Sequence, residues 1–545
     1  MSNVTDELWN FLEQIHSYST KTLLDKVKFI TQNRLDVFQP TCPTNEYLLA
    51  CALLTTKRQQ QKETTLLLLM EMYHLEEQFQ RCAVRVAYMK GPLFGNLLYD
   101  DLATRPTSDI DIYVKYEYIG KVIDILNQSG YSYSDGNSCS YDDYLYDFYR
   151  GDRRLKIIGR HAVFIKHKNN FRYTVELHVT PFRHYESNSN IDLLNTSEEI
   201  FRNTQTQECQ GKLYTVLNHC DNFLMLCSHF ARHTVEELTT FCSSNSDSCP
   251  ISLNHLHDIA LYYEKFKNKL IHEKIIERAR KFRCTADLSF TLKYLSQIYK
   301  IQPFYCMSEK ETDALLDIEN TLYIAISENI SADKLIFEDR RFVLCSLRDK
   351  IPPQKIYYCQ PIAQNQLPIA DCPVCEKCDS FSSTSSMRQL MSFSWGSALF
   401  DNYLYLCVKI PENEIEFADT DPDIKQANTA IRIYLPSYKQ EHSICTDVYE
   451  IKIYSFQGEL HTDTQLNEKE IRLECTILHE NGYIMMYPKI MLKFAHNNSL
   501  RFMISREIFM SRPHNPKHKC NFAVRWINSV AISHKTCLSF GELRR

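Results

Sequence analysis

The chain has 545 residues, 44% of them hydrophobic and 24% charged, which is the composition of an ordinary globular protein and excludes fibrous, collagenous and wholly disordered classes. The 62 Lys and Arg residues are outnumbered by 67 Asp and Glu residues, which gives a formal net charge of −5. This charge argues against nucleic acid as the main partner.

The sequence also argues against a membrane or secreted location. Its longest strictly apolar run covers residues 48–54, far short of the roughly 18 that a membrane-spanning helix requires. The first residues are polar and acidic and do not have the basic start and apolar core of a secretion signal. The 21 Cys residues are scattered over a long chain. We therefore expect a cytoplasmic protein with reduced thiols and no membrane association.

In chain order, residues 1–80 show the apolar spacing of helices that pack on a core. Residues 81–200 predict an α+β core. The β-type runs lie at 84–88, 110–114, 163–165 and 173–179, and one clear helix lies at 119–126.

Helical spacing returns over residues 201–350 and predicts a helical domain. Residues 351–388 hold five of the prolines and a Ser/Thr cluster, which is typical of a linker. In residues 389–545 apolar residues recur at every second position in many short runs, which predicts an all-β sandwich. Its expected strands lie at 404–410, 431–435, 449–454, 471–477, 483–487, 500–504 and 522–526.

Two carboxylates share one face of a predicted strand in the core. Asp109 and Asp111 are two residues apart, whereas Ile110, Ile112 and Val114 point to the opposite face. Side chains on one strand face at this spacing can share one or two hard cations. The pair therefore indicates a candidate metal site.

A second strand has the same alternation. Val175, Leu177 and Val179 form its apolar face and leave Glu176 and His178 on the other. If the two strands are neighbours, Glu176 joins the aspartates as a third acid. The alternative is a solvated sheet face with incidental acids. His178 either orients a carboxylate or caps the strand, and the second interpretation is favoured.

The turn before the first acidic strand has features of a phosphate-binding turn. Pro92 suits the first position of a helix, and Gly91 permits a close approach of the backbone. The helix start would present its N–H groups to a triphosphate, and Lys90 and Arg105 could add positive charge. Taken alone, the turn is more typical of an ordinary strand–helix connection.

Together these motifs resemble the uncharacterised nucleotidyltransferase family, which belongs to the DNA polymerase β-like superfamily. The resemblance covers roughly residues 40–300. The residues that carry it are Lys90-Gly91-Pro92-Leu93, Tyr99, Arg105, Asp109-Ile110-Asp111, Gly130-Tyr131, Val175-Glu176-Leu177-His178, His229 and Leu256-His257-Asp258-Ile259-Ala260.

The resemblance implies a polymerase β-like core and a two-metal reaction. Asp109 and Asp111 would hold two Mg²⁺ ions, and Glu176 would complete the site or take the proton of the acceptor. A nucleoside monophosphate would pass from an NTP, with ATP the first choice, to a hydroxyl or phosphate of a small molecule or protein. His229 and Asp258 are either a buried polar pair between helices or groups of the acceptor site, and the first interpretation is favoured.

One departure from the family pattern supports an alternative. The superfamily's usual Gly-Gly or Gly-Ser is Gly91-Pro92 in this sequence, so the serine contact to phosphate is missing. The alternative is a non-catalytic binding protein, with a degenerate transferase core and a β-sandwich that binds a glycan or a protein.

The linker contains a cysteine cluster. Cys372, Cys375 and Cys378 supply three of the four ligands that zinc requires, and Cys359 could be the fourth. An iron–sulfur run would place a fourth cysteine where Ser382 stands. Cysteines without a metal are the favoured interpretation.

Two charged stretches resemble binding sites only superficially. The acidic stretch at 419–423 is not an EF-hand, because Ile424 and Ala430 stand where the loop needs Gly and Glu. The basic stretch at 506–519 is interpreted as a polar loop between strands rather than as a nucleic-acid site.

The C-terminal part contains the run LFDNYLYL at 399–406, a strand at 430–435, Trp526 and Phe540-Gly541. In this order these features resemble carbohydrate-binding module family nine. The resemblance implies a β-sandwich that could bind a glycan, with Trp395 and Trp526 as possible sugar platforms or core residues.

Overall fold

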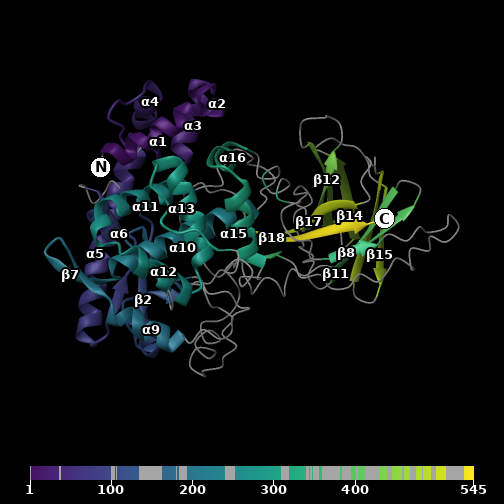
Figure 1. The fold of residues 1–545 in the computed structure, drawn as a ribbon. Helices are drawn as coiled ribbons and strands as arrows, with labels where there is room; N and C mark the ends of the chain where they lie inside the picture. The colour runs from purple at the N-terminus through teal and green to yellow at the C-terminus, as the bar shows by residue number, and fades with distance from the viewer. Residues whose placement is uncertain are drawn as a thin grey trace. The chain divides into compact units, whose positions relative to one another are not determined.

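The computed structural model divides into two compact units (Figure 1). The first comprises Met1–Thr234, Ile251–Ser327 and Ser331–Phe337, and the second comprises the remaining residues. Each unit is described by itself. The residues that the structure describes are 2–35, 38–99, 105, 107–133, 162–178, 181–182, 193–239, 252–308, 318–338, 343 and 347, and after them the strands given below.

Helices occupy most of the described residues from 2 to 81. They are α1 (Ser2–Gln14), α2 (His16–Ser19), α3 (Leu23–Gln32), α4 (Asn45–Leu53) and α5 (Thr55–Arg81). Side-chain caps start two of them, because Thr22 accepts a hydrogen bond from the backbone N–H of Asp25 and Thr44 accepts one from that of Tyr47.

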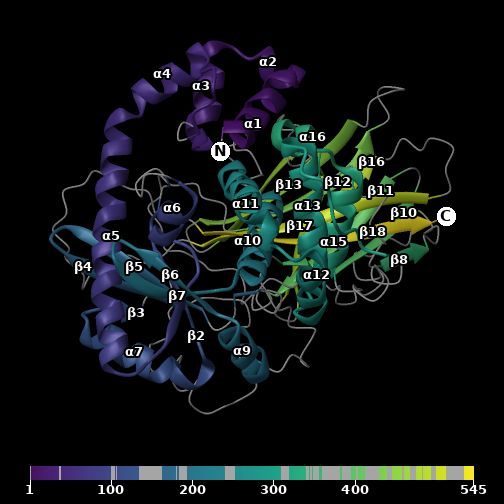
Figure 2. The ribbon, with the colours of Figure 1, turned by 60° about the vertical axis from the view of Figure 1, so that its left-hand side comes forward.

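The long helix α5 covers the central sheet of the first unit (Figure 2). Four of its apolar residues recur at helical spacing and are fully buried in the core that also contains the strand residues. These are Leu68, Met72, Leu75 and Phe79.

The central sheet has seven strands in the order β3-β4-β5-β2-β1-β7-β6. Pairing is parallel between β5 and β2 and between β1 and β7, and antiparallel elsewhere. The strands are β1 (Val86–Tyr88), β2 (Ile110–Val114), β3 (Ser132–Tyr133), β4 (Ala162–Lys168), β5 (Phe171–His178), β6 (Gln205–Cys209) and β7 (Lys212–Val216).

The hairpin β6–β7 lies in the range that the sequence predicted to be helical. β7 nevertheless pairs with β1 and extends the sheet. The four residues of β6 from Gln205 to Glu208 are polar and at least partly exposed, so the local sequence carries no apolar alternation that would predict a strand.

Nine further α-helices are described before the strands of the second unit, and the last residues of two of them, α10 and α15, belong to the second unit. They are α6 (Pro92–Leu98), α7 (Ile119–Gln128), α9 (Leu193–Arg202), α10 (His219–Thr239), α11 (Leu253–Phe266), α12 (His272–Lys281), α13 (Thr285–Tyr299), α15 (Ile318–Asn329) and α16 (Ala332–Phe337).

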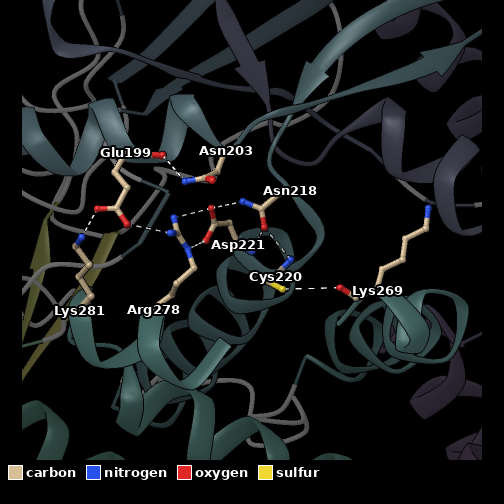
Figure 3. A network of polar contacts seen from close by, with 8 residues as sticks. All are labelled: Glu199, Asn203, Asn218, Cys220, Asp221, Lys269, Arg278 and Lys281. Atoms are coloured by element: carbon tan, nitrogen blue, oxygen red, sulfur yellow. Dashed lines mark hydrogen bonds and ion pairs between the residues drawn. The ribbon is translucent and has the colours of Figure 1, made fainter. Parts of the chain in front are cut away.

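A buried ion-pair network joins α9, α10 and α12 (Figure 3). Arg278 of α12 pairs with both carboxylate oxygens of Asp221 in α10, and its Nη2 lies 2.7 Å from Oδ2. Its Nη1 lies 3.1 Å from Oε1 of Glu199 in α9, which also pairs with Lys281. Asp221 is fully buried, so the network neutralises charge that would otherwise destabilise the helix packing.

From residue 355 onward, the described part of the second unit consists of β-strands in two sheets. The smaller has the order β10-β11-β16-β15, and the larger has β14-β13-β12-β17-β18-β8, with β9 paired to β18. The strands are β8 (Lys355–Tyr358), β9 (Phe381–Ser382), β10 (Ser394–Phe400), β11 (Tyr403–Pro411), β12 (Thr429–Ser437), β13 (Cys445–Phe456), β14 (Glu459–Leu466), β15 (Glu474–Glu480), β16 (Tyr483–Met491), β17 (Ser499–Met510) and β18 (Ser533–Arg544).

The predicted fold class, an α+β core with flanking helices followed by an all-β part, is confirmed. The linker prediction differs from the structure in two places, because β8 and β9 lie within residues 351–388 and pair with β18. Their partner strand is more than 150 residues away in sequence, so no local pattern predicts the pairing.

Several expectations fall outside the described residues. They are the cysteine cluster with Cys359, the acidic stretch at 419–423, the part of the basic stretch after residue 510, the strand at 522–526 and Trp526. Among the helices that the structure describes, none has the length and apolar character needed to cross a membrane.

Candidate functional site

A cavity of about 230 Å³ lies in the first unit. Its wall includes all six residues that the sequence predicted for the site, which are Lys90, Gly91, Arg105, Asp109, Asp111 and Glu176. The other lining residues are Arg34, Phe38, Tyr99, Thr107, Ser108, His229, Arg232, His233, Asn254, His255 and Asp258.

The three predicted acids reach this cavity from two adjacent strands. β2 and β5 are parallel neighbours, and Asp111 is paired in register with Glu176. Asp109 immediately precedes β2. Ile112 and Leu177, which are the next residues in each strand, are buried in the core. The alternation that builds the core therefore also directs the carboxylates to the opposite face.

Asp111 is held by Lys90 and His178. Its Oδ1 lies 3.1 Å from Nζ of Lys90 and 3.0 Å from Nε2 of His178. The same Nε2 lies 3.6 Å from Oε2 of Glu176. Burial would lower the pKa of His178, but hydrogen bonds to Asp111 and Glu176 outweigh burial and raise this pKa, which favours the protonated ring. His178 therefore orients a carboxylate, and the favoured interpretation that it only caps its strand is wrong.

The two aspartates differ in their affinity for protons. Burial would raise the pKa of Asp111, but Lys90 and His178 outweigh burial and hold this pKa well below its usual range. Burial raises the pKa of Asp109 to about 6, and the negative charges of Asp111 and Glu176 add to the effect. A nearby cation would therefore stabilise the ionised form of Asp109.

One set of side chains in the described residues has the geometry to hold a metal ion. Ligand atoms of Asp111, Glu176 and His178 all lie within 4.8 Å of one another. The sequence predicted Asp109 as the third ligand, together with Asp111 and Glu176, and did not predict His178. Asp109 lines the same cavity, and its Oδ2 accepts a hydrogen bond from the hydroxyl of Ser108 at 3.0 Å.

The turn at Gly91 is packed against the acidic strand. Gly91 has φ of 70°, and a Cβ at this position would lie 3.0 Å from the carbonyl oxygen of Asp109. The backbone N–H of Met89 also donates to the carbonyl of Asp111 at 3.2 Å. Glycine is therefore needed both for its conformation and for its size. Pro92 begins α6, as the sequence predicted.

Arg105 is oriented by Asp258. Its Nε donates to Oδ2 of Asp258 at 2.8 Å, and the hydroxyl of Tyr99 donates to Oδ1 at 2.5 Å. The expected pair of His229 with Asp258 is therefore wrong. His229 instead lies beside His233, with 3.1 Å between their Nε2 atoms.

Sequence reasoning missed a group of residues on the helical side of the cavity. These residues, which all line the cavity, are Arg232, His233, Asn254 and His255. From α10 the sequence indicated only His229. The available signal was the spacing of four between His229 and His233, which places both imidazoles on one face of a helix.

Residues 49–300 match the sequence model of the family described as uncharacterised nucleotidyltransferase. This match confirms the predicted resemblance and supports nucleotidyltransferase activity in general terms. A search of curated proteins gives no match.

Solved structures show a weak likeness to carbohydrate-binding module family nine. A module of this family from Caldicellulosiruptor kristjanssonii, in complex with glucose, matches at 12% identity with a TM-score of 0.22. The match covers 35% of this chain and 95% of the module. The complex with cellotriose matches with the same identity and TM-score and covers 35% and 93%.

Proposed function

We propose that the first unit transfers a nucleoside monophosphate from an NTP to an acceptor hydroxyl or phosphate. One observation carries the proposal. Strands β2 and β5 bring the carboxylates of Asp109, Asp111 and Glu176 into one cavity, within the region that matches a nucleotidyltransferase family. Three carboxylates in one cavity repel each other unless cations offset their charge.

The carboxylate oxygens fit Mg²⁺, which prefers hard oxygen ligands. Asp109, Asp111 and Glu176 would hold it, and His178 would keep the carboxylate of Asp111 in place. When bound, Mg²⁺ would neutralise the charge of the triphosphate and of the leaving pyrophosphate. Glu176, which is less buried than Asp111, would alternatively take the proton of an acceptor hydroxyl.

Lys90, Gly91 and Arg105 would bind the nucleotide. Lys90 and Arg105 are cations on the cavity wall, and the ion pair with Asp258 fixes the guanidinium of Arg105. Gly91 leaves space for a close approach to the backbone. ATP is the first nucleotide to test, and the acceptor is a small molecule or a protein.

A second candidate is a non-catalytic binding protein with a degenerate transferase core and a β-sandwich that binds a glycan or a protein. The specific observation in its favour is that Lys90 and His178 already neutralise Asp111 without a metal ion. In such a protein the acids would be structural, and Mg²⁺ would have no effect on nucleotide binding.

Binding of a nonhydrolysable ATP analogue to the full chain, with and without Mg²⁺, separates the two candidates. We expect Mg²⁺-dependent binding that weakens at least about tenfold in the double variant Asp109→Asn plus Asp111→Asn. The matched control is Asp124→Asn, an exposed carboxylate on α7. Equal affinity in the double variant and the wild type would refute the transferase site.

A further inference from the structure

The helices α10 and α11 contribute a second, chemically different part of the cavity wall. We call the rings of His229, His233 and His255 the imidazole cluster. His229, Arg232 and His233 share one face of α10, since they are three and four residues apart, and His255 comes from α11. None of these four residues has a role in the nucleotide site described above.

The imidazole cluster is tightly packed. The Nε2 atoms of His229 and His233 lie 3.1 Å apart, and Nη2 of Arg232 lies 3.3 Å from Nε2 of His233. The ring centroid of His255 lies 4.8 Å from that of His229 and 5.5 Å from that of His233. One small group in the cavity could therefore contact several of these side chains together.

One polar atom of the cluster has no hydrogen bond. Nδ1 of His255 is buried and finds no partner among the residues that the structure describes. Buried polar atoms of side chains are normally paired, and an orphaned one on a cavity wall indicates a place for a polar ligand atom.

The charges around the cluster favour an anion over a metal ion. Burial lowers the pKa of His229 well below its usual value, and the nearby cations Lys90 and Arg232 add to the effect. Burial likewise lowers the pKa of His255, with additions from Arg105, Lys90 and Arg34. Because Lys90 pairs with Asp111 and Arg105 with Asp258, the positive potential that favours an oxyanion over a metal ion at the cluster comes from Arg34 and Arg232.

The nearby carboxylate does not cancel this potential. Asp258 lines the same cavity, but its two oxygens accept hydrogen bonds from Arg105 and Tyr99. Its negative charge is therefore balanced within its own ion pair. Asp109 immediately precedes β2, Asp111 and Glu176 belong to β2 and β5, and all three would hold the metal ions of the proposed reaction.

We propose that the imidazole cluster and Arg232 bind a phosphate group carried by the acceptor. Arg232 would supply charged donors to its oxygens, and the histidines would supply further N–H donors. This inference rests on the proposed function, because it assigns the class of acceptor to the same cavity. The other possible source of the phosphate is the triphosphate of the NTP itself.

Inorganic phosphate is the probe for the subsite, measured by calorimetry on the full chain without Mg²⁺. The wild type should bind it, and Arg232→Gln and His255→Gln should each weaken binding about tenfold or more. Arg232→Lys should restore part of the affinity, because it retains the charge. The control is Arg81→Gln, an exposed arginine at the end of α5.

A second arm measures Mg²⁺-dependent binding of the ATP analogue to the same variants. Unchanged nucleotide affinity in Arg232→Gln and His255→Gln assigns the phosphate to the acceptor, whereas parallel losses overturn that assignment in favour of the NTP. Wild-type affinity for phosphate in both variants, or no phosphate binding by the wild type, overturns the subsite.

The two proposals fail separately. Asp109→Asn plus Asp111→Asn should leave phosphate binding intact, because the subsite lies on α10 and α11. Loss of phosphate binding in this double variant would contradict a separate subsite, while Mg²⁺-independent nucleotide binding would contradict only the transferase proposal.

Discussion

Asp111 combines almost complete burial with a negative charge that Lys90 and His178 stabilise. Only 2% of the residue is exposed, and Lys90 and His178 both contact its Oδ1. A buried carboxylate is tolerated only when its charge is paired and its oxygens are bonded. Because the two cationic partners meet this need, Asp111 can keep one orientation in the cavity before any ligand arrives.

His257 makes the first unit sensitive to acid. It is fully buried, its Nδ1 lies 3.2 Å from the hydroxyl of Tyr299, and burial lowers its pKa to about 3. Below pH 6.5 the unfolded chain binds a proton at this histidine and the folded chain does not, so stability falls as the pH drops from about 6.5 towards 3. At pH 5 the loss amounts to about 2 kcal/mol.

The thermal midpoint of the first unit should therefore fall less between pH 7 and pH 5 in His257→Gln than in the wild type. His74→Gln is the control, since His74 is exposed on α5. An identical fall of the midpoint in wild type and His257→Gln would contradict the assignment of acid sensitivity to this residue.

At the scale of elements, Arg278 joins three helices through one guanidinium. Arg278→Met would leave Asp221 buried without its cation, and it would also remove the guanidinium that lies over the ring of Phe282. We expect a loss of about 3–5 kcal/mol in the free energy of unfolding, measured by urea denaturation.

Lys281→Met is the matched variant for this network. Lys281 pairs with the same Glu199, but 54% of its side chain is exposed, so its removal should cost no more than about 1 kcal/mol. Equal losses in the two variants would show that burial does not set the strength of these ion pairs.

The elements also show what the sequence could predict. The acidic strands β2 and β5 were predicted because Ile112 and Leu177 alternate with polar residues, and alternation is a local signal. β8 was missed because its partner lies at the far end of the chain. The imidazole cluster was missed because His229 and His255 meet only when α10 packs against α11.

At the scale of the molecule, all residues that line the cavity belong to the first unit. The smaller sheet of the second unit has its own buried face, with Val408 paired to Met486 and Ile410 paired to Ile484. Stability of that sheet should therefore be separable from nucleotide binding by substitution.

Ile410→Ala should lower the free energy of unfolding of the second unit by about 2–5 kcal/mol, because it leaves a cavity in the buried face. The affinity for the Mg²⁺-dependent ATP analogue should stay unchanged. Calorimetry of the full chain would follow unfolding, with Ile123→Ala in the core of the first unit as the comparison variant. A weaker nucleotide affinity in Ile410→Ala would show that the second unit contributes to the site.

The in-register pairing of β2 with β5 protects the chain against a particular folding error. A slip of either strand by one residue would turn its acid into the apolar interior and expose the neighbouring Ile112 or Leu177. Such an arrangement would bury an unpaired charge and could not persist. A molecule that folds with β2 and β5 in register therefore also has its carboxylates in the cavity. The same strand pairing determines both the stability of the sheet and the geometry of the candidate site.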